Sequence, residues 1–345
     1  MPPKGDPGAN VASSSLPGSY RELLAMSPDE LAKLDLAVLD LLCAAGLPGA
    51  EKLDIPVASK KLDEWAARIK AETERHLYRL KDPQYAEHYA NSEARLRAEF
   101  IVQVLQEDCG VHYNVERINQ PDFSDSKDGF LHGMIDSDNG GTCASMPVMY
   151  AAIGRRLGYP IKLAVAKEHI FCRWEGATER LNFDGAANGG LDFPTDDYYR
   201  QWPFPISDEE MAAEQYLRSM TPQQELATFL LQRGTCLQAN GRWPEAREVF
   251  AEAHRLTPDG PEIWAALRQS VLDEALQPTW ARRGSEPAPQ RRPGPGPRRT
   301  DEDELREAIR QGMPADPTPH PPMPGGPIPT IPGPPPPPSG GPGKP

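Results

Sequence analysis

The sequence predicts an α+β fold, because helical and strand-like segments are separated along the chain. Apolar residues recur at helical spacing before residue 110, and again from Met146 to Leu157. Three short strand-like segments follow, KLAVAK, HIFCRW and RLNFD. A second helical region begins at residue 221. With 345 residues, the chain has room for one to three domains, each with its own core.

The N-terminal part predicts a bundle of helices. Residues 1–19 are rich in Pro, Gly and Ser, so we predict that they are disordered. The stretch SPDEL is typical of a helix start, with Ser27 as N-cap, Pro28 in the first turn and Glu30 completing a capping box. One helix should continue from there, with an apolar stripe of Leu31, Leu34, Val38, Leu41 and Leu42. Two more amphipathic helices are expected at about 60–80 and 84–107, and then a long loop over 111–141.

Composition and charge exclude several classes of protein. The net charge of −13 argues against nucleic-acid binding, because phosphate repels an acidic surface. No apolar run is long enough to cross a bilayer, and the N-terminus lacks the apolar segment of a secretory signal. The five cysteines have no paired spacing and are typical of reduced thiols. We therefore expect a cytoplasmic protein without nucleic-acid or membrane partners.

The C-terminal third contains a repeat-like segment and a proline-rich tail. Residues 221–281 match the spacing of a tetratricopeptide (TPR) repeat at Gly234, Leu237, Trp243, Ala246, Phe250, Ala253 and Pro258. Trp264 stands where a second repeat would begin. These helices could bind a peptide or brace the main domain. Residues 282–345 hold about half of the 40 prolines, and we predict a disordered tail that is either a spacer or a polyproline ligand.

The stretch GGTCASMPVMYAAIG, from Gly140 to Gly154, places a cysteine at the start of a helix. Pro147 lacks an N–H and is tolerated only in the first turn, so the helix should begin close to Cys143. The free N–H groups and the positive dipole end would then favour a thiolate and could supply half of an oxyanion hole. A lone cysteine at a helix start is nevertheless structural more often than catalytic.

A histidine and an aspartate lie on the strands that follow. If HIFCRW and ERLNFD pair as a hairpin around EGAT, Trp174 faces Glu179 and His169 faces Asp184. One face is then apolar, and the other carries His169 and Asp184, so a one-residue slip would destroy the pattern. The polar face should be exposed, as in a half-buried hairpin. The sequence thus predicts Cys143, His169 and Asp184 as nucleophile, base and orienting carboxylate.

Other site chemistries are less well supported. Cys172 lies on the strand face opposite His169, Cys43 and Cys236 lie within helices, and Cys109 is at a helix C-terminus, where the dipole disfavours a thiolate. No CxxC or HxxxH pair predicts zinc. Asp136 and Asp138 resemble the start of a calcium loop, but Gly140 replaces the third ligand. We therefore expect no metal and no cofactor.

The segments GGTCASMPVMYAAIGRRLGYP, EHIFCRW and LNFDG together resemble the transglutaminase-like superfamily of papain-type cysteine enzymes. The resemblance is greatest to a bacterial branch in which the core precedes TPR-like helices. It implies a helix with the cysteine at its N-terminus, packed on a small antiparallel sheet with the histidine and aspartate. It matches Cys143 to the nucleophile, His169 to the base and Asp184 to the third member. Ala144 and Ala186 depart from the common pattern of the family. No motif selects the side-chain donor of the oxyanion hole, and Asn139 is the candidate that we consider for it.

Two functions follow from this sequence. The first is a cysteine hydrolase or acyltransferase that cleaves an amide or peptide bond through a thioester. The second is a non-catalytic scaffold whose core and TPR helices bind a protein partner. A low thiol pKa and an accessible Cys143 are required only by the enzyme.

Overall fold

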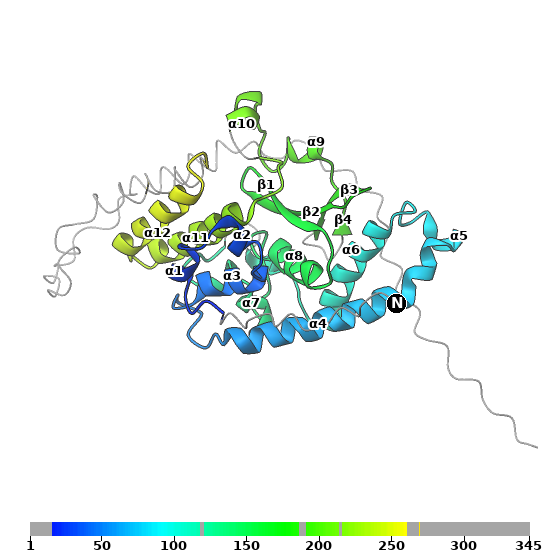
Figure 1. The fold of residues 1–345 in the computed structure, drawn as a ribbon, viewed down its shortest axis with the longest axis horizontal. Helices are drawn as coiled ribbons and strands as arrows, with labels where there is room; N and C mark the ends of the chain where they lie inside the picture. Colours follow the sequence, from blue (N-terminus) through cyan, green and yellow to red (C-terminus); the bar gives the residue numbers. More distant parts are fainter. Residues whose placement is uncertain (1–15, 118–120, 186–190, 214–215, 261–268, 270–345) are drawn as a thin grey trace, which may run out of the picture. The chain divides into compact units, whose positions relative to one another are not determined.

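The computed structural model describes residues 16–117, 121–185, 191–213, 216–260 and 269. Helices come first, a four-stranded sheet follows, and more helices end this part of the chain (Figure 1), so the predicted α+β class is confirmed. The predictions for residues 1–15, for Ala186, for a second repeat at Trp264 and for the tail fall outside the described residues.

The described chain alternates short and long helices around one small sheet. The helices are α1 Tyr20–Leu23, α2 Pro28–Leu31, α3 Leu36–Ala44, α4 Ile55–His76, α5 Pro83–Ala86, α6 Glu93–Gln103, α7 His132–Ile135, α8 Met146–Arg156, α9 Asp196–Tyr199, α10 Asp208–Ala213, α11 Pro222–Ala239 and α12 Trp243–Leu256. The strands are β1 Ile161–Ala166, β2 His169–Glu175, β3 Arg180–Gly185 and β4 Leu191–Asp192.

The predicted capping box at Ser27 is present, since the Ser27 side chain accepts from Glu30 N–H and the Glu30 carboxylate accepts from Ser27 N–H. The single long helix predicted after it is wrong, because α2 ends at Leu31 and α3 starts anew. Asp35 causes the break: its carboxylate accepts from two backbone N–H groups of the first turn of α3. The apolar stripe is therefore shared between two helices.

The helix predicted at 60–80 starts earlier, at Ile55, because Asp54 caps it. The helix predicted at 84–107 is divided into α5 and α6. Ala90 and Asn91 adopt φ values of 50° and 56°, and Ser92 caps α6 by accepting from Arg95 N–H. A left-handed backbone cannot continue an α-helix, so the chain turns there.

The sheet is an antiparallel meander in the order β1-β2-β3-β4. Cys172 lies opposite Phe183 and Trp174 opposite Leu181, so the predicted register is wrong by two residues. The turn begins at Gly176, whose N–H donates to the Glu179 carbonyl at 2.9 Å, one residue later than predicted. A shift of two residues keeps every side chain on its face.

The two faces of the sheet are covered by different parts of the chain. In Figure 1, α8 lies on one side of β1 and β2, with α9 and α10 on the other. The α8 side holds Cys172, whose thiol donates to the Pro147 carbonyl at 3.1 Å. On the other side Arg173 is fully buried, and its guanidinium donates to Asp196 and to the Leu217 carbonyl. The expectation that this polar face is exposed is therefore wrong.

Helices α11 and α12 form a hairpin that packs against the N-terminal helices. Gly234 allows the close approach of the two helices, since a Cβ at this position would lie 2.3 Å from a ring carbon of Phe250. The small residues Ala246 and Ala253 of α12 are also fully buried. Helix α11 contacts α3, and Glu225 in its first turn pairs with Arg155 of α8.

In the part of the chain that the structure describes, every helix is too short or too polar to cross a membrane.

Candidate active site

Cys143 lies in the turn that leads into α8. The first helical bond joins Met146 N–H to the Thr142 carbonyl at 2.9 Å, although α8 itself begins three residues after the cysteine. The Thr142 hydroxyl donates to the Asp128 carbonyl at 2.7 Å and accepts from Ala144 N–H at 3.3 Å. These bonds fix the backbone on both sides of Cys143, whose side chain is half-buried.

The two glycines before this turn are required by close packing. Gly140 has φ +78°, and a Cβ on it would also meet His112. A Cβ on Gly141 would lie 2.5 Å from the sulfur of Met134 and 2.6 Å from that of Met146. Their backbone can therefore pair with the segment around Tyr113, where Gly141 N–H donates to the His112 carbonyl at 2.9 Å.

His169 and Asp184 lie on neighbouring strands with their side chains on one face. His169 Nε2 and Asp184 Oδ2 are 2.5 Å apart, and the histidine side chain is only 8% exposed. Since Nε2 faces the carboxylate, Nδ1 is the ring nitrogen left for the Cys143 thiol, which is close enough to influence the pKa of His169. The structure thus places His169 in contact with Asp184 and near Cys143.

The electrostatic environment of His169 favours the protonated ring. Burial lowers its pKa, but the hydrogen bonds with Asp184 and Cys143 and the charges of those groups outweigh burial and raise the pKa to about 9. The imidazole is therefore positively charged near neutral pH and is paired with the Asp184 carboxylate.

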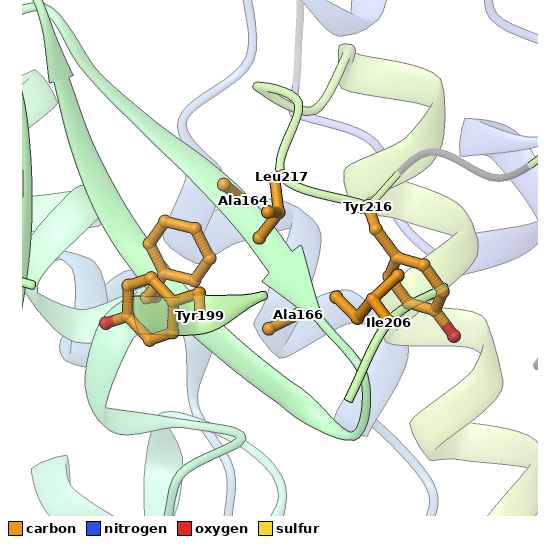
Figure 2. Close-up of a cluster of buried hydrophobic side chains, with 7 residues drawn as sticks. Ala164, Ala166, Tyr199, Ile206, Tyr216 and Leu217 are labelled. Carbon is orange, nitrogen blue, oxygen red and sulfur yellow. The ribbon is translucent and has the colours of Figure 1, made fainter. Parts of the chain in front are cut away.

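Aromatic side chains that the sequence analysis did not identify enclose this pair. The Tyr199 hydroxyl donates to Asp184 Oδ2 at 3.1 Å, and its ring stacks on Phe171 with centroids 3.9 Å apart. Trp202 meets the His169 ring edge-on at 4.8 Å. Figure 2 shows the cluster behind this contact, where Tyr199 and Leu217 lie against the strand that carries Ala164 and Ala166. The aromatic-rich run DDYYRQWPF is the signal that could have identified it.

A buried polar network holds the aromatic segment on the sheet. The Arg173 guanidinium donates to Asn182 Oδ1 at 2.8 Å, to the Leu217 carbonyl at 2.8 Å and to Asp196 Oδ1 at 2.6 Å. Asn182 also donates to Asp196. A fully hydrogen-bonded buried cation of this kind fixes geometry, and here it positions the helix that carries Tyr199.

The remaining sequence candidates lie elsewhere. The Asn139 amide donates to Asp128 Oδ1 at 2.9 Å and to the Gly140 carbonyl, so it is engaged away from the thiol. Tyr113, which no sequence motif selects, lies close enough to Cys143 for the thiol and the backbone N–H to influence the pKa of its hydroxyl.

The other four cysteines are unsuited to nucleophilic chemistry. Burial raises the pKa of the thiols of Cys43, Cys109 and Cys172 above the usual range, and that of Cys236 to about 11. Within the described ranges, the His, Cys, Asp and Glu side chains form no group of three or more that could hold a metal ion.

Comparison with known families agrees with this geometry. A sequence profile described as transglutaminase-like superfamily matches residues 57–230, about half of the chain. The match includes the turn with Cys143, the strands with His169 and Asp184, and the start of α11. The chain belongs to the transglutaminase-like superfamily. No curated protein and no solved structure gives a significant match.

Proposed function

We propose that the protein is a cysteine-dependent hydrolase or acyltransferase that acts on an amide or peptide bond. Cys143 is the nucleophile, His169 the general base and acid, and Asp184 the carboxylate that orients the imidazole. The observation that carries the proposal is the 2.5 Å contact between His169 and Asp184 beside a half-buried cysteine at a helix start. Family membership supports the same chemistry, and a protein or peptide in the cytoplasm is the expected substrate.

The proposed reaction has two halves. In the first, the proton shared by Cys143 and His169 lies on His169 Nδ1, and the Cys143 sulfur attacks the carbonyl carbon, whose π electrons move to oxygen. The tetrahedral intermediate collapses, the C–N bond breaks, and the amine leaves with the proton from His169, so that a thioester remains on Cys143. In the second, water or an amine gives its proton to His169 and attacks the thioester carbonyl. The C–S bond then breaks, the acyl group leaves as an acid or a new amide, and the proton returns to the Cys143–His169 pair.

The side chains that surround His169 and Asp184 support this scheme. Asp184 keeps Nε2 of His169 as a donor throughout, so Nδ1 alternates between accepting and donating a proton. Tyr199 donates to the same carboxylate oxygen and restricts its rotation. Trp202 limits the access of water to the His169–Asp184 bond from its side.

The alternative is a scaffold that binds a protein partner without catalysis, and the α11–α12 hairpin supports it as a candidate TPR-like surface. A scaffold has no need of a reactive thiol. The two functions therefore differ in the chemistry of Cys143.

Alkylation with iodoacetamide at pH 6.5, followed by mass spectrometry of each cysteine peptide, tests the proposal. An ordinary thiol is only about 1% thiolate at this pH, so we expect Cys143 to react at least about tenfold faster than Cys109. His169→Ala should remove this advantage, since it removes the imidazolium, and leave Cys109 unchanged. If Cys109 or Cys172 is labelled faster than Cys143 in the wild-type protein, the enzymatic proposal fails.

A further inference from the structure

Tyr113 lies beside the nucleophile although it is thirty residues away in the sequence. It precedes Asn114, whose N–H donates to the Gly141 carbonyl at 2.8 Å, and follows His112, whose carbonyl accepts from Gly141 N–H. Tyr113 and Gly141 thus form an isolated parallel β-bridge. Gly141 is two residues before Cys143, so the bridge fixes the backbone of Tyr113 close to Cys143.

The Asn114 side chain strengthens this placement. Its amide donates to the Asn139 carbonyl at 2.7 Å, so the segment around Tyr113 is bonded to residues on both sides of Gly140. A Cβ on Gly140 would come within 2.9 Å of the His112 ring, so only glycine lets the two segments meet. The pair of glycines in GGTC therefore serves to bring Tyr113 to the thiol.

The Tyr113 hydroxyl lies near the two groups of Cys143 that matter for acyl transfer. The thiol would attack a carbonyl and the backbone N–H would stabilise the resulting oxyanion, and both are close enough to influence the pKa of this hydroxyl. An oxygen atom at this position is close to the place that a substrate carbonyl oxygen must take. Burial, and then the charges of Cys143 and Asp184, raise the pKa of the Tyr113 hydroxyl, so it keeps its proton and remains a donor.

We propose that Tyr113 is the side-chain donor of the oxyanion hole, acting together with the backbone N–H of Cys143. This inference rests on the proposed function, because an oxyanion forms only if Cys143 attacks a carbonyl. Tyr113 would donate to the oxygen that becomes negative in the tetrahedral intermediate, and the hydroxyl would move off the sulfur as substrate enters. Asn139, whose amide is bonded to Asp128, takes no part.

Two reagents separate oxyanion stabilisation from thiol reactivity. In alkylation by iodoacetamide, the sulfur attacks a saturated carbon and displaces iodide. A C–S bond forms and no oxyanion is produced. With p-nitrophenyl acetate, the sulfur attacks the acetyl carbonyl, the C=O π pair moves to oxygen, and collapse expels p-nitrophenolate to leave S-acetyl-Cys143. An oxyanion-hole donor affects the second reaction and not the first.

The experiment measures both rates in the full-length wild-type protein, in Tyr113→Phe and in Cys143→Ala. Tyr159→Phe is the matched control, because its hydroxyl accepts from Arg97 at 2.8 Å beyond the opposite end of α8. Loss of one oxyanion donor typically lowers the rate of an acyl-transfer step by about 100- to 1,000-fold. For this activated ester, we expect Cys143-dependent p-nitrophenolate release to fall at least about tenfold in Tyr113→Phe, with alkylation of Cys143 within about threefold of wild type.

The possible results distinguish the two proposals. If wild type releases p-nitrophenolate no faster than Cys143→Ala, the proposed function fails and this inference fails with it. If the release depends on Cys143 but Tyr113→Phe retains it, only the inference fails. An equal fall in both rates would assign Tyr113 to the thiol, and overturns the inference as well. Tyr159→Phe should match wild type in both reactions.

Discussion

The replacement of Asp184 by Asn is the sharpest test of the arrangement around His169. Asparagine has the same shape and keeps one oxygen that can accept a hydrogen bond, but it has no charge. The carboxylate of Asp184 accepts from His169 Nε2 at 2.5 Å and from the Tyr199 hydroxyl at 3.1 Å. The substitution therefore removes the charge that faces the imidazole and leaves the packing nearly unchanged.

The size of the effect follows from the pKa of His169. Burial alone would lower it below 6.5, and it is raised to about 9 because Asp184 and Cys143 favour the protonated ring. Without the charge of Asp184, we expect the pKa of His169 to fall by about two units, to 7 or below. Each unit corresponds to about 1.4 kcal/mol, so the interaction contributes up to about 3 kcal/mol to the stability of the protonated form.

This shift also gives the loss of stability a pH dependence. A histidine whose pKa is higher in the folded than in the unfolded state stabilises the fold below about pH 6.5, and that stabilisation is lost as the pH rises through about 9. Asp184→Asn should thus be less stable than wild type at pH 6, with a difference that shrinks toward pH 9.5. Urea unfolding at several pH values measures this.

The assay for the pKa itself is an NMR titration of the His169 ring. Asp192→Asn is the matched control, because Asp192 lies opposite Asp184 in the β3–β4 pairing but makes no hydrogen bond to His169. It should leave the pKa of His169 within about half a unit of wild type. If Asp184→Asn also leaves that pKa near 9, Asp184 does not hold the imidazole and our account of the site is wrong.

Two predictions concern the rest of the fold. Gly234→Ala should destabilise the protein by about 1–2 kcal/mol in thermal unfolding, because the new Cβ overlaps the buried Phe250 ring. This overpacking outweighs the better helix propensity of alanine. A variant as stable as wild type would contradict the close packing of α11 on α12. Burial raises the pKa of Asp40 to about 8, and only its hydrogen bond from Leu131 N–H opposes this. A carboxyl pKa that is raised in the folded state removes stability as the pH rises from about 4 to 8. In urea unfolding, Asp40→Asn should therefore gain stability relative to wild type between pH 5 and pH 8. If the stability difference between variant and wild type is the same at both pH values, Asp40 is not protonated in the folded state.

The sheet could be predicted from the sequence to within a residue or two, because strands have a short period. Alternation in HIFCRW and RLNFD fixes which side chains share a face, and so it placed His169 beside Asp184. It does not fix the turn, since a shift of two residues preserves the pattern. In the observed register, Glu175 pairs with Arg180 and the turn is closed by Gly176 N–H, which donates to the Glu179 carbonyl.

Helix boundaries were less predictable, because caps compete with periodicity. Leu31 and Val38 share a helical stripe in the sequence, yet the Asp35 carboxylate binds two N–H groups and starts a new helix between them. Ala90 and Asn91 likewise adopt left-handed backbone angles inside a segment of helical composition. In both places, a local hydrogen bond or turn is worth more than the propensity of a few residues.

The surroundings of the candidate site could not be predicted, because they depend on contacts between segments far apart in the chain. Trp202 and Tyr199 come to His169 only because the buried guanidinium of Arg173 holds their segment on the sheet. Tyr113 comes to Cys143 only because two glycines leave room for a parallel bridge. A pattern on one strand or helix predicts which residues share a surface, and the position of the sulfur, imidazole and carboxylate follows from it. The groups that would bind a substrate oxygen or exclude water belong to other segments, and their role becomes visible only when the chain is folded.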